Sequence, residues 1–216
     1  MSEPESLSTE EGLETHIRRH SYDRLIMVSD GIFAIAITLA ALEIKLPEEL
    51  EGDLGAIGHA MLRPTAAYLL AFMIVAIFWL QHRDLFARLR RVDPVLTGLT
   101  LLLLCLISLV PVTVPGIYAI EHNPAGFQIY LMTMVACGVI TLAMWGYAAW
   151  RPGLMRDEVT RTFRIARTLM AAMLPAVFLI ALLVPVDQLV WVMIPIGITA
   201  GVVRRFILPR WLKAKG

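Results

Sequence analysis

An aspartate lies inside a long apolar stretch near the start of this chain. Residues 24–46 read RLIMVSDGIFAIAITLAALEIKL, which is long enough to span a bilayer as a helix of roughly 20 residues at 1.5 Å rise each. An Asp at the centre of such a helix costs about 2.5–3.5 kcal/mol of insertion free energy. Because ionisable residues in spanning helices mark functional sites, we expect the helix that carries Asp30 to line an ion pathway.

A second pattern on the same helix could form the pathway itself. Because successive residues advance by about 100 degrees, one narrow stripe within about 60 degrees holds Gly31, Ile35, Thr38 and Leu42. Around an axis, Ile35 and Leu42 would form apolar constrictions that gate by dewetting, and Thr38 would add a ring of hydroxyls. The stripe is open to a second interpretation as a helix-packing seam, with the Thr38 hydroxyl bonded to its own backbone.

The next apolar segment offers partners for Asp30. Trp79 and His82 stand at its polar end, at the membrane depth of Ser29 and Asp30. We expect His82 and the indole of Trp79 to hydrogen bond to Asp30, with Arg24 supplying compensating charge. In the alternative, Trp79 is an interfacial belt residue, His82 lies among headgroups and Arg24 snorkels.

The composition places the chain in the membrane class. Of its 216 residues, 58% are hydrophobic and only 17% are charged, and the mean hydropathy is +0.70. The basic residues form no patch with interleaved aromatics, so we expect no nucleic-acid partner. The sequence also has no GxSxG or HExxH motif and no paired carboxylates within one span. We therefore predict that the chain is not an enzyme and that it uses no cofactor or resident metal.

The apolar segments predict an all-α membrane protein with six spanning helices. The expected spans cover about 24–46, 65–82, 95–118, 127–150, 168–185 and 188–204. They form a single transmembrane domain over 21–208, preceded by a short disordered tail at 1–20 and followed by a basic tail at 209–216. The expected environment is a lipid bilayer.

The distribution of charge supports six spans. All but two of the 19 Lys and Arg residues fall in the N-terminal segment, residues 83–91, residues 151–167 or the stretch after residue 203. With six spans these places share one face, which the positive-inside rule makes cytoplasmic. Both termini are then cytoplasmic, in what we expect to be a prokaryotic inner membrane. Since the sequence shows no internal repeat, a pore on one axis requires a cyclic homo-oligomer.

The motifs on the first two spans resemble a known family. A motif on the first span is similar to the signature of prokaryotic relatives of the endosomal/lysosomal potassium channel, transmembrane protein one-seven-five. The motif consists of Arg24, Val28-Ser29-Asp30-Gly31, Ile35, Thr38 and Leu42-Glu43-Ile44. Residues 78–86, FWLQHRDLF, resemble that family's Phe-Trp-x-x-His stretch. One position departs from the family pattern, because Val28 stands where relatives carry Phe, which removes a ring near Asp30.

The resemblance implies a homotetramer in which the first helix of each subunit lines a central pore without a carbonyl selectivity filter. It assigns the hydrophobic constriction to Ile35, the selectivity-related hydroxyl to Thr38, where K⁺ binds transiently, and a further apolar ring to Leu42. It also assigns Arg24, Ser29 and Asp30 to a motif that ties the pore helix to its neighbours.

The leading hypothesis is a potassium channel that conducts monovalent cations passively, since no voltage-sensing Arg ladder or ligand domain is present. The alternative is a proton- or cation-coupled secondary transporter that uses Asp30 and His82 as a relay. A purely structural membrane protein would leave Asp30 unexplained.

Overall fold

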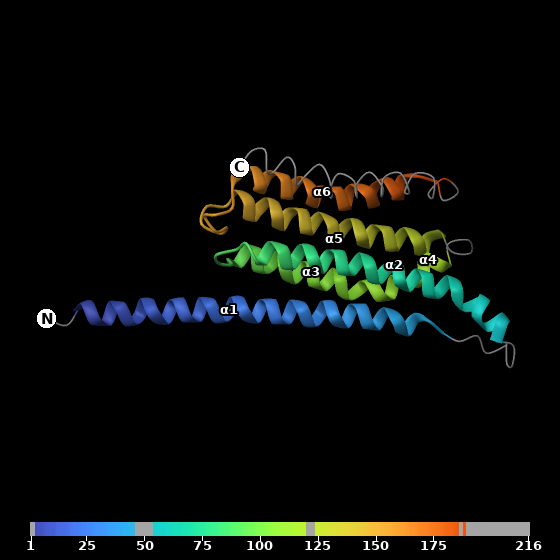
Figure 1. The fold of residues 1–216 in the computed structure, drawn as a ribbon, viewed down its shortest axis with the longest axis horizontal. Coiled ribbons are helices and arrows are strands. Elements are labelled where there is room, and N and C mark those ends of the chain that lie inside the picture. Colours follow the sequence, from blue (N-terminus) through green and yellow to red (C-terminus); the bar gives the residue numbers. More distant parts are fainter. Residues whose placement is uncertain (1–2, 46–53, 120–123, 186–187, 189–216) are drawn as a thin grey trace.

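The fold is an all-helical bundle. The computed structural model describes residues 3–45, 54–119, 124–185 and 188. The helices in chain order are α1 (Glu3–Leu39), the 3-10 helix η1 (Ala40–Glu43), α2 (Leu54–Phe86), α3 (Pro94–Thr113), α4 (Pro115–Tyr118), α5 (Pro124–Trp150) and α6 (Arg161–Leu183). The five long helices run side by side, with α1 and α6 on opposite sides of the bundle (Figure 1).

Five segments are long and apolar enough to cross a membrane. They are His20–Glu43, Leu54–Phe86, Pro94–Thr113, Pro124–Trp150 and Arg161–Leu183. They correspond to the first five predicted spans. The sixth predicted span, 188–204, and the predicted basic tail, 209–216, lie outside the described residues, apart from Gln188.

Three helices begin well before the predicted spans, and one of them is α6, which begins at Arg161 and not at residue 168. Residues 3–20, expected to form a disordered tail, belong to α1, which extends beyond the bundle (Figure 1). This segment is rich in Glu, which favours helix, and a spanning helix supplies the nucleus from which it continues. The second span, predicted to begin at residue 65, begins at Leu54, so that Pro64 lies inside α2. Apolar segments tolerate an internal proline when neighbouring groups satisfy the freed carbonyl.

Local signals explain the other boundaries. Asp93 is the N-cap residue of α3, because its carboxylate accepts a hydrogen bond from the Leu96 backbone N–H at 2.8 Å. Thr160 begins α6 in the same way through the N–H of Phe163. The predicted third span divides into α3 and α4, since Pro115 at the start of α4 has no N–H to continue the α3 ladder.

The core is apolar and runs the length of the bundle. α5 packs against α3 and α6, while α1 packs against α3 and α2. Phe33, Phe78, Leu96 and Trp145 are each no more than 1% exposed and join these helices into one cluster. At the α5–α6 contact, Gly138 leaves room for Pro175, so the two backbones approach closely.

The close approach at Gly138 gives a test of the packing. A Cβ there would lie 2.9 Å from Pro175, so Gly138→Ala is expected to destabilise the folded protein by about 1–3 kcal/mol. Thermal unfolding in detergent measures the change. Gly146→Ala on the same helix is the matched control, because its Cβ would meet no atom within 4 Å. Equal melting temperatures for the two variants would contradict the proposed packing.

Candidate functional site

Asp30 on α1 is held by the second spanning helix. The Trp79 indole Nε1 donates a hydrogen bond of 2.8 Å to Asp30 Oδ1, the contact expected from the sequence. The Arg83 guanidinium lies over the face of the same ring, 4.8 Å from its centroid. Trp79 therefore touches a carboxylate at its edge and a cation on its face, and both contacts suit the charge distribution of an indole.

The positive charge beside the Asp30–Trp79 contact comes from Arg83 and not from Arg24. In the described part of the chain, Arg24 is exposed and makes no ion pair with Asp30. The six-residue separation explains this outcome, because it places the two side chains about 120 degrees apart around α1. Sequence reasoning missed Arg83, although its spacing of four residues from Trp79 puts the two on one helix face.

His82 does not hydrogen bond to Asp30, and this part of the predicted network is wrong. The His82 ring is 3% exposed, stacks on Phe86 at 4.3 Å between centroids and lies 5.7 Å from Phe33 of α1. Its Nε2 has no hydrogen-bond partner among the described residues. Because His82 is three residues beyond Trp79, its ring points deeper into the bundle and acts as an aromatic contact between α1 and α2.

The other two motif positions have simple local roles. Ser29 is fully buried, and its Oγ donates to the Leu25 carbonyl at 2.7 Å, so the hydroxyl is satisfied within α1. Val28 is 49% exposed, so the position where the family carries Phe lies on the outer surface of the single chain. The substitution therefore leaves the core of this chain intact.

The predicted pore stripe lies on the exposed face of α1. Ile35 is 57% exposed and Leu42 is 70% exposed, and Gly31 and Thr38 are exposed between them. The opposite face packs into the bundle through Leu25, Ser29, Phe33, Ala36 and Ala40. An apolar stripe turned away from its own bundle must meet lipid, another chain or a pore, so its role as a pore lining stays a prediction.

The Thr38 hydroxyl is oriented by its own helix. Its Oγ1 donates to the carbonyls of Ala34 and Ile35, at 3.1 and 3.0 Å. A hydroxyl whose proton is committed to the backbone keeps its oxygen lone pairs for a ligand. The backbone bond and a role as a cation ligand are therefore compatible.

A half-buried charge cluster at the loop end of the bundle was not predicted. Asp84 of α2 forms ion pairs with Arg88 and with Arg167 of α6. Arg167 also lies 5.1 Å from the Trp145 ring centroid. The four-residue spacing of Asp84 and Arg88 signals one of these pairs, but no local pattern signals Arg167. Desolvation lowers the pKa of Arg88. The cluster ties α2, α5 and α6 together near the same end as the Asp30–Trp79 contact.

Comparison with known proteins gives one consistent family. Residues 24–111 match the model of the family described as endosomal/lysosomal potassium channel TMEM175. A potassium channel of Streptomyces collinus is 35% identical over 129 residues, which cover 56% of this chain and 62% of that protein. The endosomal/lysosomal proton channel TMEM175 of Danio rerio is 28% identical over 151 residues, or 68% of this chain and 28% of that protein. The chain thus covers less than two thirds of either relative, and both relatives are named as channels, not as enzymes.

The fold has a counterpart among solved structures. The crystal structure of a lysosomal potassium-selective channel TMEM175 homolog from Chamaesiphon minutus aligns with a TM-score of 0.66 and 24% identity. The alignment covers 91% of this chain and 98% of that one, so the two share a fold. The resemblance predicted from the first two spans is confirmed.

The Asp30–Trp79 contact can be tested by substitution. We expect Asp30→Asn and Asp30→Ala to lower the yield of folded, assembled protein, because a hydrogen bond to a charged group contributes about 1.5–3 kcal/mol. Trp79→Phe removes the donor and should act in the same direction. Size-exclusion chromatography in detergent measures the assembled fraction.

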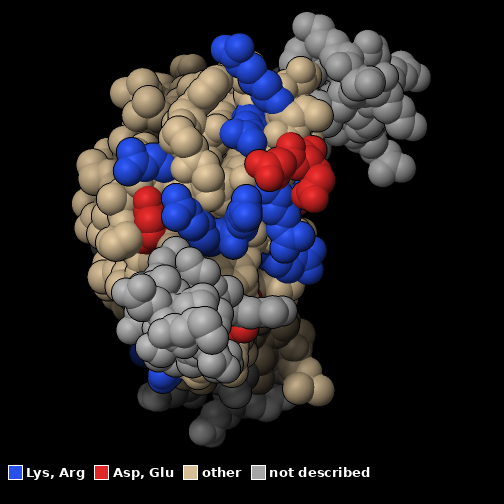
Figure 2. Space-filling view, turned by 90° about the vertical axis from the view of Figure 1, so that its left-hand side faces the viewer, with Lys and Arg blue, Asp and Glu red and all other residues tan. Residues whose placement is uncertain are grey.

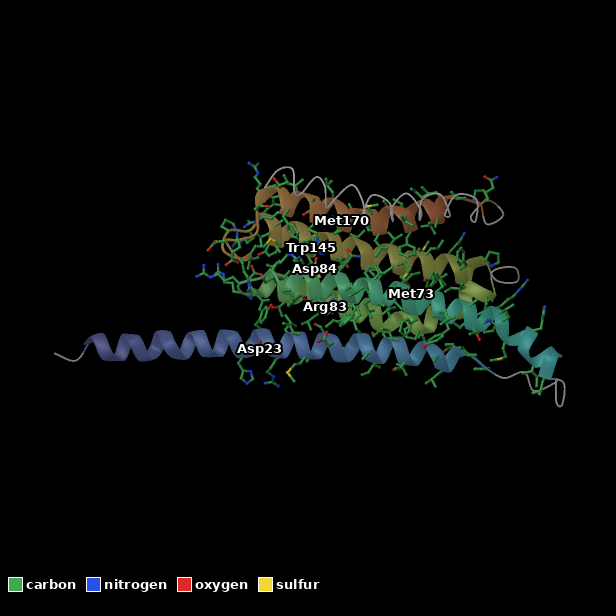
Figure 3. All side chains as sticks on the ribbon, viewed as in Figure 1. Asp23, Met73, Arg83, Asp84, Trp145 and Met170 are labelled. Carbon is green, nitrogen blue, oxygen red and sulfur yellow. The ribbon has the colours of Figure 1, made fainter. Side chains whose placement is uncertain are left out.

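Asp23→Asn is the matched control, since Asp23 is an exposed carboxylate two turns earlier on α1 (Figure 3). Normal assembly of both Asp30 variants would rule out an anchoring role for this contact.

Proposed function

We propose that this chain, a homologue of the TMEM175 family, forms a potassium-permeable channel in which four copies surround a pore lined by α1. The observation that carries the proposal is the exposed stripe of Ile35, Thr38 and Leu42, turned away from the core while Asp30 is bonded to α2. Conduction is passive, and no ring of backbone carbonyls serves as a filter.

The requirement for several copies follows from where the stripe lies. Within one chain it faces outward, so a closed pathway needs other copies of the same surface. Identical chains meet such a surface through cyclic symmetry. The number four comes from the family resemblance, and a sixth spanning helix in each subunit comes from the apolar run 188–204 and the charge distribution.

The residues of the stripe would form three successive rings along the pore. Ile35 forms a constriction that gates by losing water, Leu42 forms a second apolar ring, and the Thr38 oxygens provide a polar ring between them. Apolar rings distinguish K⁺ from Na⁺ only through pore size and the cost of dehydration. The proposed channel therefore has modest selectivity, to which the Thr38 ring contributes.

The orientation follows from the charge distribution. Arginines gather at the end of the bundle formed by residues 87–93 and 151–160 (Figure 2). By the positive-inside rule this end faces the cytoplasm, which also places the start of α1 there. The membrane is then the inner membrane of a prokaryotic cell.

The transporter alternative has little support. A relay from Asp30 to His82 needs the two groups in contact, but His82 stacks on Phe86 and Asp30 is bonded to Trp79. The relatives are named as channels.

Ion conduction by the purified protein, measured as currents in planar bilayers and as flux in liposomes, tests the proposed function directly. The purified protein in planar bilayers is expected to give unitary currents whose reversal potential follows the K⁺ gradient. Saturable flux with a fixed ion stoichiometry and no unitary currents would contradict a channel. A proton gradient applied alone measures proton permeation, which the name of the Danio rerio relative makes worth testing.

The constriction assigned to Ile35 predicts a gain of conductance. Ile35→Asn should keep this ring wet and raise resting K⁺ flux by about tenfold or more, equivalent to about 1.4 kcal/mol on the barrier. Leu69→Asn on α2, which is also an exposed apolar position, is the control for polarity alone. Unchanged flux in the Ile35 variant would remove Ile35 from the gate.

The hydroxyl ring assigned to Thr38 predicts a loss of selectivity. Thr38→Ala should lower the K⁺/Na⁺ permeability ratio about threefold, because a neutral polar contact contributes roughly 0.5–1.5 kcal/mol. Thr38→Ser keeps the oxygen and should retain most of the ratio. Reversal potentials under bi-ionic conditions give the measurement, and equal ratios in all three proteins would exclude this role.

A further inference from the structure

Two loops at the basic end of the bundle are joined into one unit. Leu89 pairs with Met155 in an isolated antiparallel bridge between the α2–α3 and α5–α6 connections. The Arg90 N–H donates to the Leu154 carbonyl at 2.8 Å, and the Arg156 N–H donates to the Arg88 carbonyl at 3.0 Å. These bonds hold the two connections side by side, although more than 60 residues separate them in the sequence.

The unit has an apolar underside and a cationic outer surface. Leu89, Leu154 and Met155 are each no more than 2% exposed and seat the loops on the bundle. Four exposed arginines occupy the outer side and form what we call the arginine platform: Arg90, Arg91, Arg151 and Arg156.

A glycine turn brings two members of the platform together. Gly153 adopts a φ of 76°, which favours glycine, two residues after Arg151. The guanidinium of Arg91 lies over this turn, with its Nη2 3.3 Å from the position that a Cβ of residue 153 would occupy. The turn thus places Arg91 beside the 151–154 segment.

The four arginines of the platform outnumber the three acidic residues of the two connections, Asp93, Asp157 and Glu158. Asp157 approaches Arg90 at 3.7 Å, but their side chains are 93% and 69% exposed, so this pair contributes little. Arg88, just before the platform, differs because Asp84 engages it within the bundle. Figure 2 shows Lys and Arg side chains gathered over this end, with acidic groups among them.

We propose that the arginine platform binds the phosphate headgroups of anionic phospholipids in the adjoining leaflet. The spanning helices α2 and α5 end at Phe86 and Trp150, so the platform lies where headgroups begin. Guanidinium groups bind phosphate oxygens through paired N–H donors, and a basic residue near an anionic membrane contributes about 1 kcal/mol. A bound headgroup would also relieve repulsion among the four cations. This inference rests on the chain lying in a membrane and is independent of ion conduction.

Native mass spectrometry of the intact protein with defined lipids tests the platform. Wild type is expected to retain phosphatidylglycerol in preference to phosphatidylcholine. Arg91→Gln and Arg151→Gln should each weaken phosphatidylglycerol binding about fivefold, equivalent to about 1 kcal/mol. Arg91→Lys and Arg151→Lys should retain part of the preference, because lysine keeps the positive charge. The retention is partial because lysine lacks the paired N–H donors of the guanidinium group.

Arg63→Gln is the matched control, since Arg63 lies in the half of α2 that is away from the platform. Melting temperatures confirm that the variants are folded, and K⁺ flux reports separately on the channel. Equal phosphatidylglycerol binding by wild type and the Arg91/Arg151 double variant would overturn the proposal. An equal loss in Arg63→Gln would overturn it as well, since it would show that total charge and not the platform sets the preference.

Discussion

The rotation of α1 about its own axis is the constraint on which the proposed pathway depends. One hydrogen bond, from the Trp79 indole to Asp30, ties one side of this helix to α2. The stripe of Ile35, Thr38 and Leu42 is centred about 110 degrees away around the helix, so holding Asp30 against α2 keeps the stripe outward. Part of the cost of placing a carboxylate within the membrane is thereby offset by a contact that also sets the orientation of α1.

The features predicted correctly from the sequence are those with local causes. Apolar length predicted five described spans, and helical spacing predicted that Ile35, Thr38 and Leu42 share one face of α1; the exposure of that face comes from the structure. Trp79 was found as the partner of Asp30, since the apolar segments put both at one membrane depth. The length of the apolar segments and the positions of residues along them carry this information.

Other features depend on how the helices pack, which no local pattern specifies. The direction of the His82 ring follows from its neighbours Phe33 and Phe86, and Arg167 meets Asp84 only because α6 lies beside α2. The early start of α2 has a different cause: a proline usually marks a helix boundary in a sequence, but a membrane helix can continue through Pro64. The pairing of Leu89 with Met155 joins distant loops that each looked like simple connections.

The central claim is that α1, and no other helix, lines the axis of a four-fold assembly. A density map of the purified oligomer in lipid nanodiscs tests it most directly. The account predicts four copies with Ile35, Thr38 and Leu42 facing the axis and the Asp30–Trp79 contact away from it. A map in which α1 faces lipid, or in which another helix surrounds the axis, would contradict it.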